Sequence, residues 1–222
     1  MTAAAFSDLG PFFAVDIHVR GQAPTSPFST LAASIAEPAV FDERVSRVRA
    51  ALAAGAAADV AQVQTRVAAS VTHLGLIARV LAPAIAASAE GGALTLAAAD
   101  IWWCDQLGGP FPVSMTWADS VPATLGVVDD LGELFTERYG ISPRIVGGNV
   151  ASAANSAARM IATSAPTLSA SAHRAADDIL RRSHVEDGIL RAGTGFRRRS
   201  CCLIYRVAGT RAAVCGDCVL GG

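Results

Sequence analysis

Four of the five cysteines lie within the last 22 residues of this 222-residue chain. They form an adjacent pair, Cys201 and Cys202, followed after twelve residues by the C-x-x-C motif of Cys215 and Cys218. In a chain that is kept reduced, grouped cysteines indicate a metal or redox site before they indicate disulfides. Four thiolates suit an iron–sulfur cluster or a tetrahedral zinc ion. The C-terminus therefore predicts a metal centre.

The adjacent cysteine pair favours a two-iron cluster over a single ion. Neighbouring α-carbons are about 3.8 Å apart, and in a regular strand their side chains leave on opposite faces. Binding of one ion by both cysteines therefore requires a local break in the backbone. Two irons relax this constraint, whereas structural zinc usually takes its cysteines from C-x₂₋₄-C spacings. We expect a [2Fe–2S] cluster, with zinc and disulfide or thiol redox chemistry as the alternatives.

The charge of the chain is nearly balanced, and its positive charges gather beside the cysteines. The 18 basic residues, all Arg, and the 19 acidic residues give a net charge of −1, which does not support a general nucleic-acid footprint. Arg197, Arg198 and Arg199 directly precede the cysteine pair. Because a four-thiolate [2Fe–2S] centre is anionic, these arginines are expected to offset its charge and to receive an anionic substrate. The alternative is that they only keep the segment soluble.

The apolar patterning predicts an α+β fold that is mainly helical. Alternation over residues 13–20 predicts a strand, and a Gly-Gly-Pro turn between two apolar runs predicts a hairpin over residues 93–117. Asp42 and Asn149 are expected to cap helices, and Gly140 to end one. We expect helices over residues 42–54, 57–88, 127–138, 149–164 and 169–183. Residues 1–192 would form a helical substrate-binding domain, on which a cysteine-bearing hairpin in residues 193–222 packs.

Several other residues carry weaker functional signals. Trp102 and Trp103 are candidates for lining a substrate site, with core packing as the favoured alternative. Cys104 is expected to be a buried small hydrophobe rather than a ligand. The acidic pairs at 129–130 and 177–178 suit helix starts, and the four histidines, which share no ligand spacing, suit surface or interface positions.

The start of the chain lacks the basic and apolar regions of a secretory signal, so we expect a cytoplasmic protein. Charged residues and Pro83 interrupt the Ala-rich stretches, and no stable insertion into a membrane is expected.

The ending RRRSCCLIYRVAGTRAAVCGDCVL resembles the C-terminal [2Fe–2S] segment of the FhuF-like ferric-siderophore reductases, whose signature is an adjacent cysteine pair followed by C-x-x-C. The stretch VGGNVASAANSAARMI, with Gly148 and Asn149, is similar to the Gly-Asn helix start of that family, and LGPFFAVDIHV is similar to its N-terminal strand. The resemblance implies that Cys201, Cys202, Cys215 and Cys218 hold the cluster.

The resemblance also implies one-electron reduction of a ferric siderophore. Hard oxygen donors hold Fe³⁺ far better than Fe²⁺, so a single electron releases the metal. No flavin or nicotinamide motif is visible, so a separate cytoplasmic donor, a ferredoxin or a flavoprotein reductase, is expected to supply the electron. A ferredoxin-like carrier without a substrate and a zinc-stapled binding protein are the alternatives.

Overall fold

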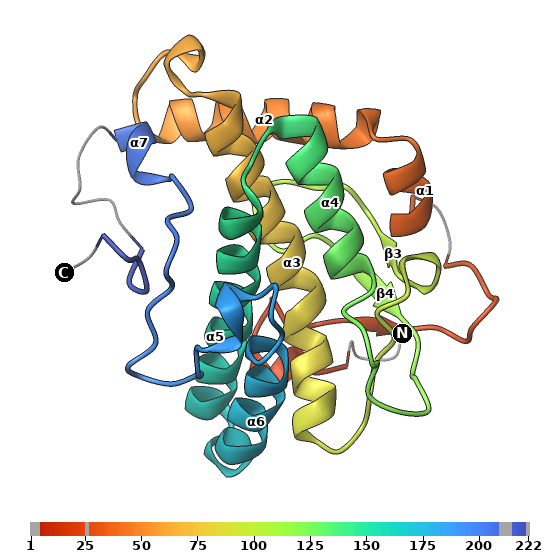
Figure 1. Cartoon of the computed structure of the whole chain (residues 1–222). Coiled ribbons are helices and arrows are strands. Elements are labelled where there is room, and N and C mark those ends of the chain that lie inside the picture. The colour runs from red at the N-terminus through yellow and green to blue at the C-terminus, as the bar shows by residue number, and fades with distance from the viewer. Residues whose placement is uncertain (1–4, 25–26, 209–214, 221–222) are drawn as a thin grey trace.

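The computed structural model describes residues 5–24, 27–208 and 215–220 and shows a mainly helical protein with a small mixed sheet at one side (Figure 1). The helices are α1 (Leu31–Ala36), α2 (Ala39–Gly55), α3 (Thr65–Ala89), α4 (Val127–Tyr139), α5 (Pro143–Ser164), α6 (Ser169–Leu180) and α7 (Tyr205–Ala208). Single 3₁₀ turns lie at Ser7–Leu9, Val60–Gln62, Ala98–Asp100, Pro166–Leu168 and Glu186–Gly188. The prediction of a mainly helical fold is confirmed.

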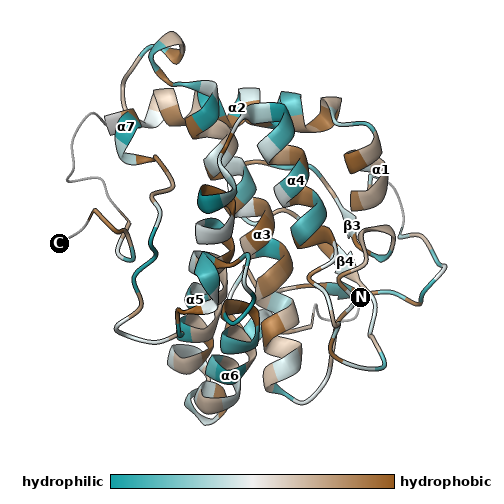
Figure 2. Ribbon diagram, viewed as in Figure 1, coloured by the Kyte–Doolittle hydropathy of each residue, from teal (hydrophilic) through white to brown (hydrophobic). Residues whose placement is uncertain are grey.

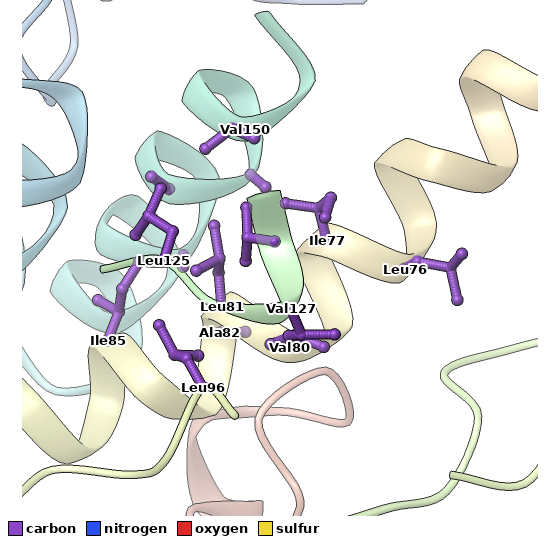
Figure 3. Packing of buried hydrophobic residues seen from close by; sticks show 14 of the residues in the cluster. Leu76, Ile77, Val80, Leu81, Ala82, Ile85, Leu96, Leu125, Val127 and Val150 are labelled. Carbon is purple, nitrogen blue, oxygen red and sulfur yellow. The ribbon is translucent and has the colours of Figure 1, made fainter. Parts of the chain in front are cut away.

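The core lies where α3 packs between α5, α4 and α2, with α6 against both α3 and α5. Figure 3 shows the aliphatic side chains of α3 meeting residues of α4, α5 and the connecting segments. Their labelled members are Leu76, Ile77, Val80, Leu81, Ala82, Ile85, Leu96, Leu125, Val127 and Val150. Apolar stretches face this centre while hydrophilic ones lie on the outer faces of the helices (Figure 2). Burial of this apolar stripe is what fixes the helices together.

α3 has the length and hydropathy of a membrane-spanning helix, although charged residues interrupt it. However, 72% of its most apolar 18-residue window is buried inside the protein. The core helix of a soluble protein has the same length and composition, and α3 holds that position here. Pro83 does not end α3, which continues to Ala89.

The sheet has the strand order β1-β4-β3-β2, formed by β1 (Asp16–Ile17), β2 (Ser29–Thr30), β3 (Trp102–Trp103) and β4 (Val113–Met115). The predicted hairpin is confirmed, because β3 and β4 pair antiparallel. The strand predicted over residues 13–20 is shorter than expected, since only β1 pairs there, parallel to β4. Arg79 of α3 is 3% exposed and donates to the carbonyls of Phe12 and Phe111. It ties the core helix to the segments beside the sheet.

Three helix starts differ from the prediction. The helix predicted over residues 57–88 begins only at Thr65, because the capped turn at Val60–Gln62 interrupts it. Asp42 does not cap α2, which begins after Pro38, and instead accepts hydrogen bonds from Arg138 and Tyr139 of α4.

The third misplaced start is that of α5. Ser142 caps this helix and Pro143 occupies its first turn, a combination that favours helix initiation. Asn149 is therefore well inside α5 rather than at its cap. The predicted α4 and its left-handed C-cap at Gly140 are confirmed.

The acidic pairs differ from each other. Asp129 and Asp130 lie in the first turn of α4, as expected, whereas Asp177 and Asp178 lie near the C-terminal end of α6. The Asp177 carboxylate accepts from the backbone N–H of Ala192, which holds the following loop. The prediction of a helix start at the second pair is wrong.

The predicted C-terminal hairpin is also wrong for the described residues. After the cysteine pair the chain turns and enters α7, and residues 215–220 form turns. Residues 209–214, which belong to the expected hairpin, lie outside the described residues. In Figure 1 the described segment that leads to α7 runs along the outer side of α5, on the side of the bundle opposite β3.

Candidate metal centre

The four C-terminal cysteines approach one another as two pairs. Cys202 Sγ lies 3.3 Å from Cys215 Sγ, and Cys218 Sγ lies 3.7 Å from Cys201 Sγ. All four are free thiols, and these separations are far longer than a disulfide bond. Each pair takes one cysteine from the adjacent pair and one from the C-x-x-C motif. Cys201 and Cys202 thus contact different cysteines, as expected for neighbouring residues whose side chains diverge.

The sulfur separations fit metal ligation. Metal–thiolate bonds of about 2.3 Å in tetrahedral geometry place two sulfurs about 3.8 Å apart. Within the part of the chain that the structure describes, no three Cys, His, Asp or Glu side chains are grouped for a single ion. Two pairs of thiols are instead the arrangement that the two irons of a [2Fe–2S] cluster need.

A local break in the backbone follows the two adjacent cysteines. Leu203 has a φ of 70°, a left-handed conformation that a branched residue rarely adopts. Its backbone N–H donates to Cys201 Sγ at 3.3 Å, and the N–H of Leu220 donates to Cys218 Sγ at 3.4 Å. These amides stabilise negative charge on both sulfurs of one pair.

Three of the four thiols have shifted pKa values. The hydrogen bond from Cys215 lowers the pKa of Cys202 to about 6, assisted by the backbone N–H of Ile204 and the positive charge of Arg198. The pKa of Cys215 is raised, because its proton is shared with the Cys202 thiolate. Burial raises the pKa of Cys201 to about 11. Cys202 is therefore the thiol most readily deprotonated among these three, a state that metal binding needs.

The cysteine segment is anchored to the helices by a small apolar cluster. Leu203 packs with Val67 at the start of α3 and Ile145 at the start of α5, and all three are buried. Cys202 and Cys218 are each 1% exposed, whereas Cys201 and Cys215 are partly exposed. Each sulfur pair thus has one buried and one partly exposed member, and a cluster held there would lie close to the surface.

A second, polar anchor centres on Arg198. The side chain is 1% exposed, and its Nη2 donates to Asn149 Oδ1 at 2.9 Å. Asn149 Nδ2 in turn donates to the backbone carbonyl of Ser70 at 3.1 Å and lies 3.2 Å from His73 Nδ1. His73 is fully buried, which lowers its pKa to about 3, so the expectation of a surface or interface position is wrong for this histidine.

The Arg198 guanidinium supports the fit of an anionic group at this site. Its Nε and Nη1 atoms are buried and have no hydrogen-bond partner among the described residues. Buried donors are nearly always paired in native proteins, so these two indicate a missing acceptor. The sulfurs of a [2Fe–2S] cluster are acceptors with negative charge, and the donor set therefore fits the cluster.

Gly148 is needed where this anchor crosses α5. A Cβ there would overlap Ser200 Oγ and come within 2.6 Å of Glu186 Oε1. Ser200 Oγ donates to the same carboxylate oxygen at 2.9 Å, and the N–H of Arg199 donates to the other at 3.1 Å. The Gly-Asn dipeptide thus serves close packing of the cysteine segment on α5, not the start of the helix.

The three arginines before the cysteine pair separate into two kinds. Arg198 is buried, whereas Arg197 and Arg199 are exposed, and Arg199 forms an ion pair with Asp187. The expectation that all three form one surface is therefore wrong for Arg198, because the anchor on α5 holds its side chain inside.

The aromatic candidates lie elsewhere. Trp103 is 1% exposed and stacks on Phe41, with ring centroids 5.8 Å apart, and Trp102 is partly buried beside it in β3. β3 and the C-terminal segment lie on opposite sides of the bundle (Figure 1). This placement favours core packing. Cys104 is 7% exposed, which agrees with the expected buried small hydrophobe.

Sequence reasoning missed most of the anchor. Glu186, Ser200 and Ser70 belong to no recognisable motif, and Asn149 suits a helix cap as well as a buried hydrogen-bonding position. One signal was present in the sequence. If Ser142 and Pro143 are taken as the start of α5, Asn149 falls on the buried face of this Ala-rich helix, directly after two glycines.

Comparison with known proteins agrees with this geometry. Residues 198–220 match the family model of the FhuF 2Fe-2S C-terminal domain. No curated protein and no solved structure matches the chain. The matched stretch begins at the buried Arg198 and includes all four cysteines, so its cofactor is a [2Fe–2S] cluster. Residues 198–220 thus confirm the resemblance of this chain to the FhuF-like proteins, at their iron–sulfur segment.

Proposed function

We propose that this protein is a ferric-siderophore reductase in which Cys201, Cys202, Cys215 and Cys218 hold the [2Fe–2S] cluster. The observation that carries the proposal is the arrangement of these thiols as two pairs within the segment that matches the FhuF 2Fe-2S C-terminal domain. A partly exposed thiol in each pair gives an electron a short path to a molecule docked at the surface.

The reaction balances as a single electron transfer. A bound cluster would supply one electron, and Fe³⁺ in the siderophore becomes Fe²⁺. Catecholate and hydroxamate oxygens are hard donors that bind Fe²⁺ much more weakly, so the metal is released while the chelator stays intact. No general acid, base or nucleophile is needed. The chain has to hold the cluster, keep it near the surface and bind an iron complex beside it.

Arg197 and Arg199 are the residues that we assign to substrate docking. Both are exposed, next to the buried anchor of Arg198 and close in sequence to Cys201. Many ferric siderophores are anionic, and guanidinium groups bind oxyanions through paired N–H donors. We leave Trp103 out of this assignment because it is buried in the core on the other side of the bundle.

We further propose that the electron comes from a separate protein, a ferredoxin or a flavoprotein reductase, and that the reaction takes place in the cytoplasm. The lack of a nucleotide-binding motif in the sequence supports the proposal of a separate electron donor.

The test is stoichiometric reoxidation. The purified protein is reduced under anaerobic conditions and mixed with ferric siderophores or with simple ferric chelates of matched driving force. Recovery of the visible absorbance of the oxidised cluster gives the rate, and an Fe²⁺-specific chelator reports the product. The expected result is one Fe²⁺ per reduced cluster, formed faster from at least one siderophore than from the simple chelates.

Two outcomes would contradict the proposal. Equal rates with every ferric complex would indicate a ferredoxin-like carrier without a substrate site. A colourless protein with bound zinc and no inorganic sulfide would indicate a structural zinc site. The Cys104→Ser variant is the control for cysteine substitution, because this buried thiol follows β3, on the side of the bundle opposite the other four cysteines.

A further inference from the structure

Arg198 carries a positive charge inside the protein. Its side chain is 1% exposed, and no ion pair involving it occurs in the described part of the chain. The buried carboxylate of Glu186 is occupied by Ser200 Oγ and by the N–H of Arg199. Ser200 Oγ also lies 3.5 Å from Arg198 Nη2, so Glu186 reaches the guanidinium only through this hydroxyl. A buried guanidinium without a direct ion pair is costly. Its retention indicates a negatively charged partner.

The unused donors of Arg198 define where that partner binds. Nη2 donates to Asn149 Oδ1 at 2.9 Å, while Nε and Nη1 are buried and have no partner among the described residues. The guanidinium is thus fixed from one side only. Asn149 is itself held by the carbonyl of Ser70, so the side chain of Arg198 has little freedom to find other acceptors.

The backbone of Arg198 lies beside the cysteine segment. Arg198 comes three residues before Cys201, and its backbone N–H donates at 3.0 Å to the carbonyl of Asp217, which lies between Cys215 and Cys218. The residue is therefore close to both halves of the cysteine set.

We propose that Arg198 donates hydrogen bonds from Nε–H and Nη1–H to the sulfur atoms of the [2Fe–2S] cluster and thereby raises its reduction potential. By formal counting, a four-thiolate cluster carries two negative charges when oxidised and three when reduced. A fixed positive charge with donors aimed at sulfur stabilises the more negative state more strongly. Arg198 contacts the cluster in this scheme, and substrate docking is left to the exposed Arg197 and Arg199.

The inference rests on cluster binding within the proposed function and not on the substrate. A protein that keeps the [2Fe–2S] cluster but reduces no siderophore would leave it intact. Conversely, the nitrogen coupling and the potential shifts expected for Arg198 can fail to appear while siderophore reduction persists.

The first experiment uses the unsubstituted full-length protein grown with ¹⁵N-labelled arginine. In the reduced, paramagnetic state, pulsed EPR detects nitrogen nuclei that are hydrogen-bonded to the cluster. We expect a ¹⁵N coupling from arginine that disappears in Arg198→Lys labelled in the same way and persists in Arg197→Gln. If the unsubstituted protein shows no arginine coupling, the proposal is wrong.

The second experiment compares reduction potentials by redox titration followed by EPR. For Arg198→Gln we expect the equilibrium constant for reduction to fall at least tenfold, which corresponds to a potential lower by about 59 mV for one electron. Arg198→Lys keeps the charge without the forked donors, so its shift should be smaller and in the same direction. Arg197→Gln removes the same charge from an exposed neighbour and should shift the constant less than about threefold.

Equal shifts of the reduction potential in Arg198→Gln and Arg197→Gln, with full iron and sulfide in both variants, would overturn the proposal. The loss of any nearby positive charge would then explain the shift. If Arg198→Gln does not assemble the cluster, the potential of Arg198→Lys and the nitrogen coupling of the unsubstituted protein decide the question.

Discussion

Replacing Gly148 by Ala tests how closely the cysteine segment must pack on α5. The added Cβ would overlap Ser200 Oγ and lie 2.6 Å from Glu186 Oε1 and 2.8 Å from Arg198 Nη2. All three side chains are buried, so none can move into solvent. The substitution must push the segment away from the helix or break the bond between Ser200 and Glu186.

The expected cost follows from three contributions. Overpacking of a tight contact costs about 1–3 kcal/mol. Loss of a buried hydrogen bond to a charged group costs about 1.5–3 kcal/mol. Alanine in a helix interior gains about 1 kcal/mol over glycine. We therefore expect Gly148→Ala to lower the free energy of unfolding by about 1.5–5 kcal/mol and to weaken cluster retention, because Arg198 and Ser200 lie just before Cys201.

The assay is urea denaturation followed by far-UV circular dichroism, with the visible absorbance of the cluster recorded in parallel. Gly75→Ala is the matched control, since Gly75 lies inside α3 and an added Cβ would meet nothing within 4 Å. That variant should be more stable than the parent by roughly 0.5–1 kcal/mol. Equal behaviour of the two variants, with full iron content in both, would refute close packing at Gly148.

The remaining predictions concern the ligands and the docking surface. Cys215→Ser and Cys218→Ser should each lose most of the iron and inorganic sulfide, because a serine oxygen replaces a soft thiolate poorly, whereas Cys104→Ser should keep both. Colorimetric iron and sulfide analysis checks this. Full retention in either of the first two variants would remove that residue from the ligand set. The double variant Arg197→Gln, Arg199→Gln should reduce an anionic ferric siderophore about three- to tenfold more slowly than the parent at low ionic strength, because the docking charge is removed. The difference between the two rates should shrink near 0.15 M salt, where the Debye length is about 8 Å. If stopped-flow rates of the double variant and the parent are equal at low salt, these arginines have only a solubilising role.

Much of the candidate site could be predicted from the sequence because its information is local. The spacing of four cysteines is a property of the chain itself, and it is enough to indicate an iron–sulfur cofactor. The same holds for α4, whose apolar spacing and following Gly140 are enough to place both its ends. Local patterns failed where two signals competed, as at Ser142 and Asn149, which both suit a helix cap.

The C-terminal hairpin failed for a different reason. Two short apolar runs on either side of a glycine suit a hairpin, but Leu203 is drawn onto Val67 and Ile145, which are far away in sequence. Burial of that side chain, together with the left-handed backbone at Leu203, turns the chain into α7 instead of a strand. Local propensity is weak enough for a tertiary contact to override it.

The sequence by itself determined which atoms can bind metal, the nearly balanced charge and the helical character of the chain. Only the tertiary structure decided which cysteine meets which, and that Arg198 differs from its two neighbours. Three consecutive arginines are chemically identical in the sequence, yet Arg198 alone is buried against Asn149 of α5. The pairing of sulfurs and the burial of one charge both depend on contacts between segments that are distant in the chain. The spacing of residues along the sequence does not determine such contacts.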